Sequence, residues 1–236
     1  GALTLAGIIQ KSSNVGVTKI ALAIEEKLFW QVLNDAVWLV NGIQGYEAIR
    51  NDLSPDERAK IDPLFRQMAD FLSVESVKTF DMIHNHATWA TAGVGMTGYV
   101  LGDRDLVERA LKGSRKDGSA GFLKQVDELL SPDGYYAEGG YYQRYALWPF
   151  MVFANAIERY DPAVGIFKRR DGILVKAVRT AIDLTYRGHF IPFNDALKEK
   201  SLNTDELYQS VAIAYARSGD PALLSIAQWQ GRVALS

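Results

Sequence analysis

The chain has 236 residues, of which 48% are hydrophobic and 23% charged, a composition ordinary for one packed domain or two small ones. Its formal net charge of −2 excludes a global basic field that would recruit nucleic acid or an anionic membrane surface, so a polyanionic ligand would need a local basic cleft. The absence of cysteine excludes a thiol nucleophile, a zinc–cysteine site and disulfides, and no apolar run reaches the roughly 18 residues of a membrane span.

Helical periodicity dominates the chain. The predicted helices cover 28–49, 55–71, 74–101 with a glycine-rich interruption at 92–98, 103–112, 121–130, 142–160, 170–186, 204–216, and a last segment from Asp220-Pro221 toward Trp229. Only 189–193 weakly suggests a strand. The sequence therefore predicts an all-α fold of helical hairpins, which periodicity alone leaves open as a bundle, a solenoid or an (α/α) toroid.

Three short patterns mark where the predicted helices begin and end. Ser54 is followed by Pro55 and Glu57, which is the pattern of a capping box. Asn203 with Glu206 three residues later predicts a second capping box. Gly188 suits the C-terminal stop of the helix over 170–186.

The segment IHNHATWATAG, residues 83–93, contains two of the three histidines in the chain. A lone histidine on an apolar helix is more often a core residue than a catalyst. Here His84, Asn85 and His86 cluster, and small residues that permit a close approach follow Trp89, so the core and functional interpretations both stay open. A metal site is not predicted, because no HExxH or carboxylate cluster accompanies the pattern and alternate helical residues point about 200° apart.

The stretch GYYAEGGYYQRY, residues 134–145, contains five tyrosines. Packing in a loop that enters a buried helix accounts for most of them. Arg144, however, lies two residues from Tyr142 and next to Tyr145. A cation close to a phenol lowers its pKa from about 10, so a tyrosine placed in this way can act as a general base and then as a general acid.

Amide, imidazole and phenol groups together suit β-elimination on a uronic acid. That reaction must neutralise a carboxylate, remove the neighbouring C5 proton and protonate the leaving O4. None of these steps requires a cofactor or a metal, and the sequence predicts neither.

Four segments carry a resemblance to a known family: FWQVLNDAVWLVN, HNHATWATAG, DGYYAEGGYYQRYALWPF and RRDGILVKAVRTAIDLT. From about Phe29 onward the chain resembles the α/α-toroid part of alginate lyases, particularly oligoalginate lyases of polysaccharide lyase family 17, which are related to heparinase II/III lyases. The resemblance implies a periplasmic or secreted enzyme that acts on an acidic oligo- or polysaccharide, with no nucleic-acid or membrane partner. Such lyases are longer, and a downstream part supplies a second catalytic tyrosine and a histidine.

Individual roles follow from the same resemblance. The pair that binds and neutralises the substrate carboxylate corresponds to Asn85 and His86, and the catalytic acid/base corresponds to Tyr142. Arg144 and Tyr145 are expected to line the subsite. Trp89 is expected either to stack on a sugar or to belong to the core. Asn194, in the loop FIPFNDA, either lines the cleft or caps a helix.

The first 24 residues resemble a different family, the class B penicillin-binding proteins, in the segment around a Ser-x-Asn motif that Ser12-Ser13-Asn14 would form. No Ser-x-x-Lys or Lys-Ser/Thr-Gly accompanies it. We therefore expect an N-terminal segment of uncertain origin, 1–24, and a partial toroid lyase domain, 25–236. The alternatives are a catalytically incomplete helical carbohydrate-binding or scaffold fragment, and a transpeptidase fragment. The sequence predicts no oligomeric state.

Overall fold

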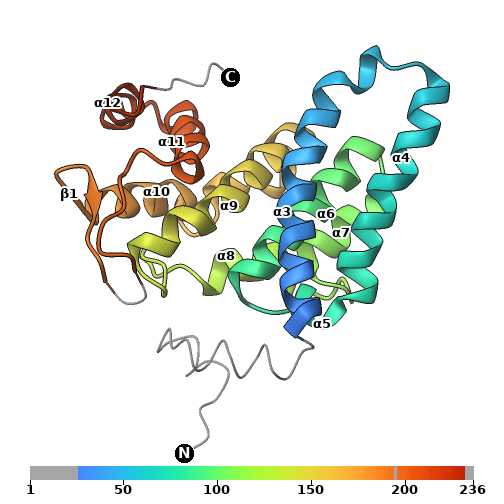
Figure 1. The fold of residues 1–236 in the computed structure, drawn as a ribbon, viewed down its shortest axis with the longest axis horizontal. Coiled ribbons are helices and arrows are strands. Elements are labelled where there is room, and N and C mark those ends of the chain that lie inside the picture. The colour runs from blue at the N-terminus through green and yellow to red at the C-terminus, as the bar shows by residue number, and fades with distance from the viewer. Residues whose placement is uncertain (1–25, 194–195, 232–236) are drawn as a thin grey trace, which may run out of the picture. The chain divides into compact units, whose positions relative to one another are not determined.

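The structure is a computed structural model that describes residues 26–193 and 196–231 (Figure 1). Apart from one two-stranded sheet, the regular elements of these residues are helices, which confirms the predicted all-α class. Contacts divide the chain at residue 128 into two compact units, called here the N-terminal unit (Glu25–Glu128) and the C-terminal unit (from Leu129). Within the described ranges, no helix is both long and apolar enough to cross a membrane.

The N-terminal unit is built around one buried helix, α6. Every residue of α6 from 85 to 98 is buried, and α3 and α7 pack against it. The elements of this unit are α3 (Glu26–Ile49), η1 (Arg50–Asp52), α4 (Pro55–Asp70), the π-helical η2 (Phe71–Glu75), α5 (Val77–Phe80), α6 (Asn85–Leu101), α7 (Arg104–Lys112) and α8 (Gly121–Glu128).

The glycines of α6 are packing positions, and the predicted interruption of this helix at 92–98 is wrong. A Cβ at Gly93 would lie 3.1 Å from a side-chain atom of Leu39, and a Cβ at Gly98 would lie 2.8 Å from the backbone nitrogen of Val107. The missing side chains therefore let α3 and α7 approach the backbone of α6. The helical run breaks earlier instead, in the non-helical residues 81–84.

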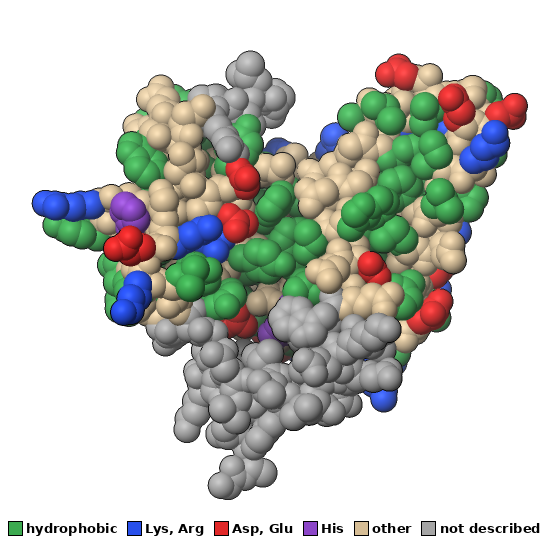
Figure 2. Space-filling model, viewed as in Figure 1, with side chains coloured by type: hydrophobic (Ala, Val, Ile, Leu, Met, Phe, Trp, Pro, Cys, Tyr) green, Lys and Arg blue, Asp and Glu red, His purple; other side chains and the backbone are tan. Residues whose placement is uncertain are grey.

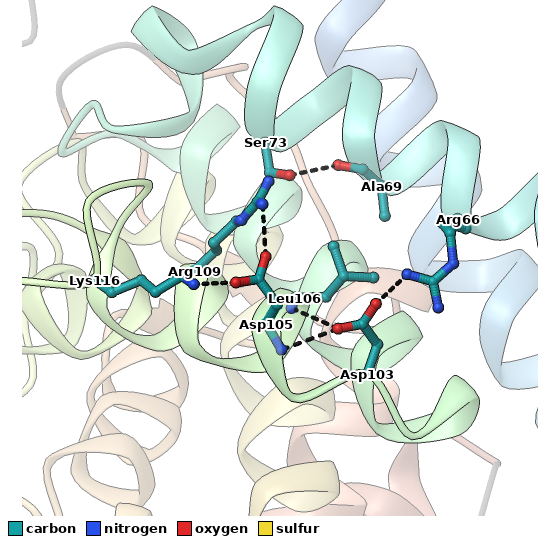
Figure 3. Close-up of polar contacts among 8 residues, drawn as sticks. All are labelled: Arg66, Ala69, Ser73, Asp103, Asp105, Leu106, Arg109 and Lys116. Carbon is teal, nitrogen blue, oxygen red and sulfur yellow. Dashed lines mark hydrogen bonds and ion pairs between the residues drawn. The ribbon is translucent and has the colours of Figure 1, made fainter.

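Side-chain caps fix two helix starts in this unit, one of them predicted. Ser54 and Glu57 form the predicted capping box at the start of α4. Asp103 caps α7 by accepting from the backbone N–H groups of Asp105 and Leu106, and it also pairs with Arg66 of α4 (Figure 3). These contacts fix the start of α7 where it packs on Gly98.

A second set of charges holds the side of α7. The carboxylate of Asp105 lies 2.6 Å from Arg109 and also pairs with Lys116, which lies beyond the end of the helix (Figure 3). Because both ion pairs are partly exposed, we expect them to contribute little to stability. Their consequence is geometric: they hold the loop after α7 against its first turn.

The C-terminal unit is a set of helices with a short hairpin. Its elements are α9 (Gly140–Tyr160), η3 (Pro162–Val164), η4 (Ile166–Lys168), α10 (Ile173–Asp183), β1 (Thr185–Tyr186), β2 (His189–Phe190), α11 (Asp205–Ser218) and α12 (Pro221–Trp229). The strands are antiparallel, with Thr185 opposite Phe190 and Tyr186 opposite His189.

Polar bridges show that α9 and α11 run in the same direction. An ion pair joins Arg144 to Glu206, and the Trp148 indole N–H donates to Gln209 over 2.9 Å. Further along both helices, Arg217 donates to the Asn155 side chain over 2.6 Å. Because residue numbers rise along both helices from one bridge to the next, the first turns of α9 and α11 lie at the same end of the pair.

Two predicted helix ends in this unit are wrong. Helix α10 ends at Asp183, and Gly188 lies in the hairpin turn with φ of 78°, where a Cβ would lie 2.7 Å from the ring of Trp229. The N-cap of α11 is Thr204, not Asn203. Glu206 is therefore the second helical residue, whereas a capping box uses the third, and its carboxylate pairs with Arg144.

Hydrophobic side chains gather on the surface of the N-terminal unit over α3 and α4 (Figure 2). Trp38 of α3 and Leu64 of α4 are 55% and 60% exposed. The Trp38 ring stacks on Phe65 with 5.9 Å between centroids. This apolar face belongs to the two helices. Helix α4 also carries exposed charged residues, so charged and apolar side chains alternate around its surface.

Candidate active site

The first group of predicted site residues, called here the Asn85–His86 group, lies at the start of α6 in the N-terminal unit. His84 has an extended backbone (φ −163°, ψ 156°) and caps the helix: its Nδ1 accepts from the backbone N–H of His86 over 3.3 Å. The two imidazole rings meet edge to face, with 4.8 Å between centroids. Asn85 and His86 are the first two residues of the helix, so the structure places the predicted carboxylate-binding pair at a helix N-terminus, where backbone dipoles favour anions.

A buried polar network lies one turn further along α6. The hydroxyl of Thr88 contacts the His84 carbonyl oxygen at 3.3 Å and also contacts the Gln125 side-chain oxygen of α8. The Gln125 amide reaches the hydroxyl of Thr91 at 3.5 Å, and Thr91 donates to the carbonyl of Ala87 over 2.8 Å. Since Thr88, Thr91 and Gln125 are fully buried, α8 fixes the first turns of α6 through these contacts.

Burial sets the protonation of both histidines. It lowers the pKa of His84 to about 4 and, with a further contribution from His84, lowers the pKa of His86 to about 2. Both imidazoles are therefore neutral at neutral pH. In that state a histidine offers a carboxylate one N–H donor, not a positive charge.

Trp89 belongs to the core. Its side chain is fully buried and is among the largest buried side chains of the protein. Of its two predicted roles, the structure supports packing, because a fully buried ring presents no face on which a sugar could stack.

The second group of predicted site residues, called here the Tyr142 group, lies in the loop before α9 and at the start of α9 in the C-terminal unit. Gly134 has φ of 88°, and a Cβ there would lie 2.7 Å from the backbone of α10 at Lys176 and at Ala177. The hydroxyl of Thr180 in α10 donates to the carbonyl of Asp133 over 2.5 Å. The loop that begins the tyrosine stretch is therefore pressed directly onto α10.

Gln143 fixes the same loop from the side of α9. Its fully buried side-chain amide donates to the carbonyls of Gly134 (2.7 Å) and Ala177 (2.8 Å), and its oxygen accepts from the backbone N–H of Tyr136 over 3.1 Å. One side chain thus joins the loop, α9 and α10. Because Tyr142 precedes Gln143 and Arg144 follows it, these hydrogen bonds also hold the backbone of both neighbours in place.

The five tyrosines fall into different environments. Tyr136 is 1% exposed and is a core residue, while Tyr135, Tyr141, Tyr142 and Tyr145 are partly exposed. The rings of Tyr141 and Tyr142 meet edge to face, with 5.0 Å between centroids. Tyr142 therefore lies in the first turn of α9 with part of its surface open to solvent, as a proton-transferring residue requires.

Arg144 is buried against Tyr141. Its guanidinium carbon lies 4.5 Å from the centre of the Tyr141 ring, and the group pairs with Glu206 at the start of α11. The Arg144 side chain is 5% exposed and that of Glu206 is 24% exposed. Residues three apart lie on the same side of a helix, which is why Arg144 contacts the ring of Tyr141. Its expected effect on the pKa of Tyr142 stays a prediction.

The Arg144–Glu206 pair also sets the electrostatics around Tyr145. Burial is the main cause that raises the pKa of Tyr145 to about 12; the Glu206 carboxylate raises it further and Arg144 opposes both. Burial would raise the pKa of Glu206, but its backbone hydrogen bond and Arg144 outweigh burial and lower it. Tyr145 is therefore a neutral phenol at neutral pH.

The sequence analysis did not predict four roles in these surroundings: the hydrogen bonds of Gln125 and of Gln143, the ion pair of Glu206, and the capping by His84. Gln143 lies inside the tyrosine-rich stretch 134–145, and a polar residue in a largely apolar helix is the pattern that could have indicated its role. Glu206 was noticed, but as a cap. Asn194 lies outside the described residues, as do Ser12, Ser13 and Asn14.

The two groups of predicted site residues lie in different units, and each group is fixed by contacts within its own unit. Within the described part of the chain, no group of three or more histidine, aspartate or glutamate side chains is placed to hold a metal ion. The Asn85–His86 group offers neutral donors at a helix start. The Tyr142 group offers a partly exposed tyrosine near the start of a helix whose Arg144 pairs with Glu206.

Comparison with known proteins gives one consistent result. A family model described as alginate lyase matches residues 16–188. An alginate lyase of Stenotrophomonas maltophilia (strain K279a) is 58% identical over 214 residues, which are 90% of this chain and 29% of that protein. An exo-oligoalginate lyase of Saccharophagus degradans (strain 2-40) is 59% identical over 211 residues, which are 89% of this chain and 29% of that protein. The chain thus spans less than a third of the length of these two relatives.

Proposed function

This chain belongs to the alginate lyase family, and we propose that its protein is a polysaccharide lyase that cleaves alginate or its oligomers by β-elimination. The observation that carries the proposal is the high identity to two proteins named as alginate and exo-oligoalginate lyases, which extends over about nine-tenths of the chain and so includes both groups of predicted site residues. We further propose that the helices belong to an (α/α) toroid, and that the protein is periplasmic or secreted, where an extracellular polymer would reach it.

Asn85 and His86 would act on the substrate carboxylate. Negative charge grows on that carboxylate as the C5–H bond breaks, so donors aimed at it stabilise the transition state more than the ground state. The amide of Asn85 and the neutral imidazole of His86 are suitable donors, and the start of α6 adds its dipole. The acidity of C5 would rise through hydrogen bonding to the carboxylate.

Tyr142 would transfer the proton. In its phenolate form Tyr142 takes the C5 proton, the electron pair of the C5–H bond forms the C4=C5 double bond, and the C4–O4 bond breaks. The leaving O4 then receives a proton from the tyrosine, which restores the phenolate. Arg144 lies over the face of Tyr141, whose ring meets that of Tyr142, and through this contact it would favour the phenolate of Tyr142. Tyr145 would line the subsite as a neutral phenol.

A second candidate function is a helical carbohydrate-binding or scaffold part without activity of its own. The observation that favours it is that the chain spans only 29% of the relatives it matches. The two candidates differ in turnover but not in binding.

One substrate panel separates them. The chain and the full-length protein are each mixed with polymannuronate, polyguluronate and heparan oligomers, and the ultraviolet absorbance of the new double bond is followed. Double bonds formed from one of the alginate polymers, with loss in His86→Ala, support the lyase. Binding by calorimetry without turnover in either form supports the second candidate. Acylation by a fluorescent penicillin would contradict both.

A further inference from the structure

We propose that His84 is a positioning residue of the candidate site: it holds both the backbone and the imidazole of His86 in the orientation that presents the pair to the substrate carboxylate. That Asn85 and His86 bind the substrate carboxylate rests on the proposed function. The position of the His86 ring does not rest on it, so activity and ring position are measured separately below.

The first step is the cap itself. An N-cap side chain normally accepts from the backbone N–H of the second or third helical residue, and serine, threonine, asparagine and aspartate are the residues that do so best. At α6 the cap is an imidazole nitrogen, and the donor is the N–H of the second helical residue, His86. A histidine is not needed for capping alone, because an asparagine would accept the same hydrogen bond.

The second step is the ring contact, which a smaller cap would not make. The imidazole of His84 meets that of His86 edge to face at 4.8 Å, and both side chains are 7% exposed. The same side chain therefore contacts both the backbone nitrogen of His86 and its ring. A side chain held at both ends has fewer orientations to lose when substrate binds.

The third step is the support beneath His84. Its carbonyl accepts from the backbone N–H of Thr88 over 3.1 Å and also contacts the Thr88 hydroxyl, which is joined to Gln125 of α8. His84 is thus anchored to a neighbouring helix through fully buried groups. Its position passes to His86 through the cap and the ring contact.

The cap also fixes a tautomer. Because Nδ1 of His84 accepts a hydrogen bond, the neutral ring must carry its proton on Nε2. Only three histidines occur in the chain, so imidazole nitrogen NMR can resolve each of them. We expect the Nε2–H tautomer at His84 at neutral pH, and we expect the His86 ring signals to move in His84→Asn.

The activity arm compares two substitutions in the full-length protein. His84→Asn keeps a cap acceptor and removes the ring, whereas His84→Ala removes both. If His84 positions His86, both variants lose kcat/KM on oligoalginate by about 100-fold, the effect of misplacing a reacting group by an ångström, although only the alanine variant loses thermal stability. Ser54→Asn, a cap replacement at the exposed start of α4, is the control and keeps wild-type kcat/KM.

A double-mutant cycle decides whether His84 acts through His86. In a His86→Ala background, His84→Asn should cause no further loss of kcat/KM, since the group that it positions is already gone. Wild-type activity in His84→Asn, or an equal further loss in the His86→Ala background, would overturn the inference. Unchanged His86 ring signals in His84→Asn would overturn it as well. If His86→Ala itself leaves activity intact, the proposed function fails, and the NMR arm alone decides the positioning of the ring.

Discussion

Arg144 and Glu206 form an ion pair between the first turns of α9 and α11, and the Arg144 guanidinium also covers the face of Tyr141 at 4.5 Å. The positive charge of Arg144 is therefore compensated within the C-terminal unit. An arginine held in this way orders the start of α9, which carries Tyr142.

Breaking that pair from the Glu206 side should destabilise the protein. Glu206→Gln leaves the buried Arg144 without its counter-charge, and we expect a loss of about 2 kcal/mol in the free energy of unfolding, measured by urea denaturation. It should also lower the pKa of Tyr145 from about 12, because the carboxylate that raises it is gone. Asp205→Asn removes one negative charge from the exposed neighbouring position and is the control. Equal effects of both substitutions would mean that the ion pair has no special role.

Gln143 should be required for the loop before α9. Gln143→Met keeps the approximate shape but leaves two carbonyls and the N–H of Tyr136 without this partner, which we expect to cost on the order of 3 kcal/mol in unfolding free energy. Hydrogen exchange of the Tyr136 amide should accelerate. The exposed Gln67→Met is the control. Unchanged exchange at Tyr136 would show that the loop is held by other contacts.

Gly134 and Gly165 separate steric clash from backbone strain. Both have positive φ, at 88° and 63°, but only at Gly134 would a Cβ meet backbone atoms, at 2.7 Å; at Gly165 nothing lies within 4 Å. We expect Gly165→Ala to cost about 1 kcal/mol in unfolding free energy through φ alone. Gly134→Ala should cost about 3 kcal/mol or more, because the loop must move off α10. Similar losses for the two would contradict the close approach.

The buried histidines should make the protein sensitive to mild acid. In the unfolded chain they titrate near 6.5, but in the folded protein the pKa is about 4 for His84 and about 2 for His86. Between pH 6.5 and 4 the unfolded state thus binds more protons, so stability is complete above pH 6.5 and falls as pH is lowered, by on the order of 1 kcal/mol per pH unit for each histidine. Urea midpoints across this range measure the slope, and His84→Asn should remove about half of it. A flat profile would contradict neutral, buried imidazoles.

Local chemistry let much of the fold be predicted from the sequence. The capping box at Ser54 and the helix starts at Asp103 and Asp220 follow from side chains that bond their own backbone within a few residues. Such interactions depend on no distant partner, so a sequence pattern suffices to place them.

The failures arise where a distant contact decides the structure. The glycines of α6 looked like a break, but they are places where α3 and α7 approach the helix. Glu206 had the spacing of a cap, yet it pairs with an arginine 62 residues earlier, and Gly188 turns a hairpin that packs on Trp229. Each outcome depends on tertiary neighbours that the local pattern does not encode.

The roles of Asn85, His86 and Tyr142 come from motifs and family resemblance, and they stay predictions. Trp89 had two possible roles until its burial placed it in the core. Gln125 and Gln143 act by joining elements that are distant in sequence, so only the folded structure identifies them.

The central claim is that Tyr142 is present for its proton, and the most direct test is Tyr142→Phe in the full-length protein. The initial rate of double-bond formation on oligoalginate is compared with that of the wild type and of Tyr135→Phe, a control in the same tyrosine stretch, with folding checked by circular dichroism. We predict a loss of about 1,000-fold or more for Tyr142→Phe, typical of removing an acid–base group, and a near wild-type rate for Tyr135→Phe. A folded Tyr142→Phe variant that forms the double bond at the wild-type rate would contradict the claim.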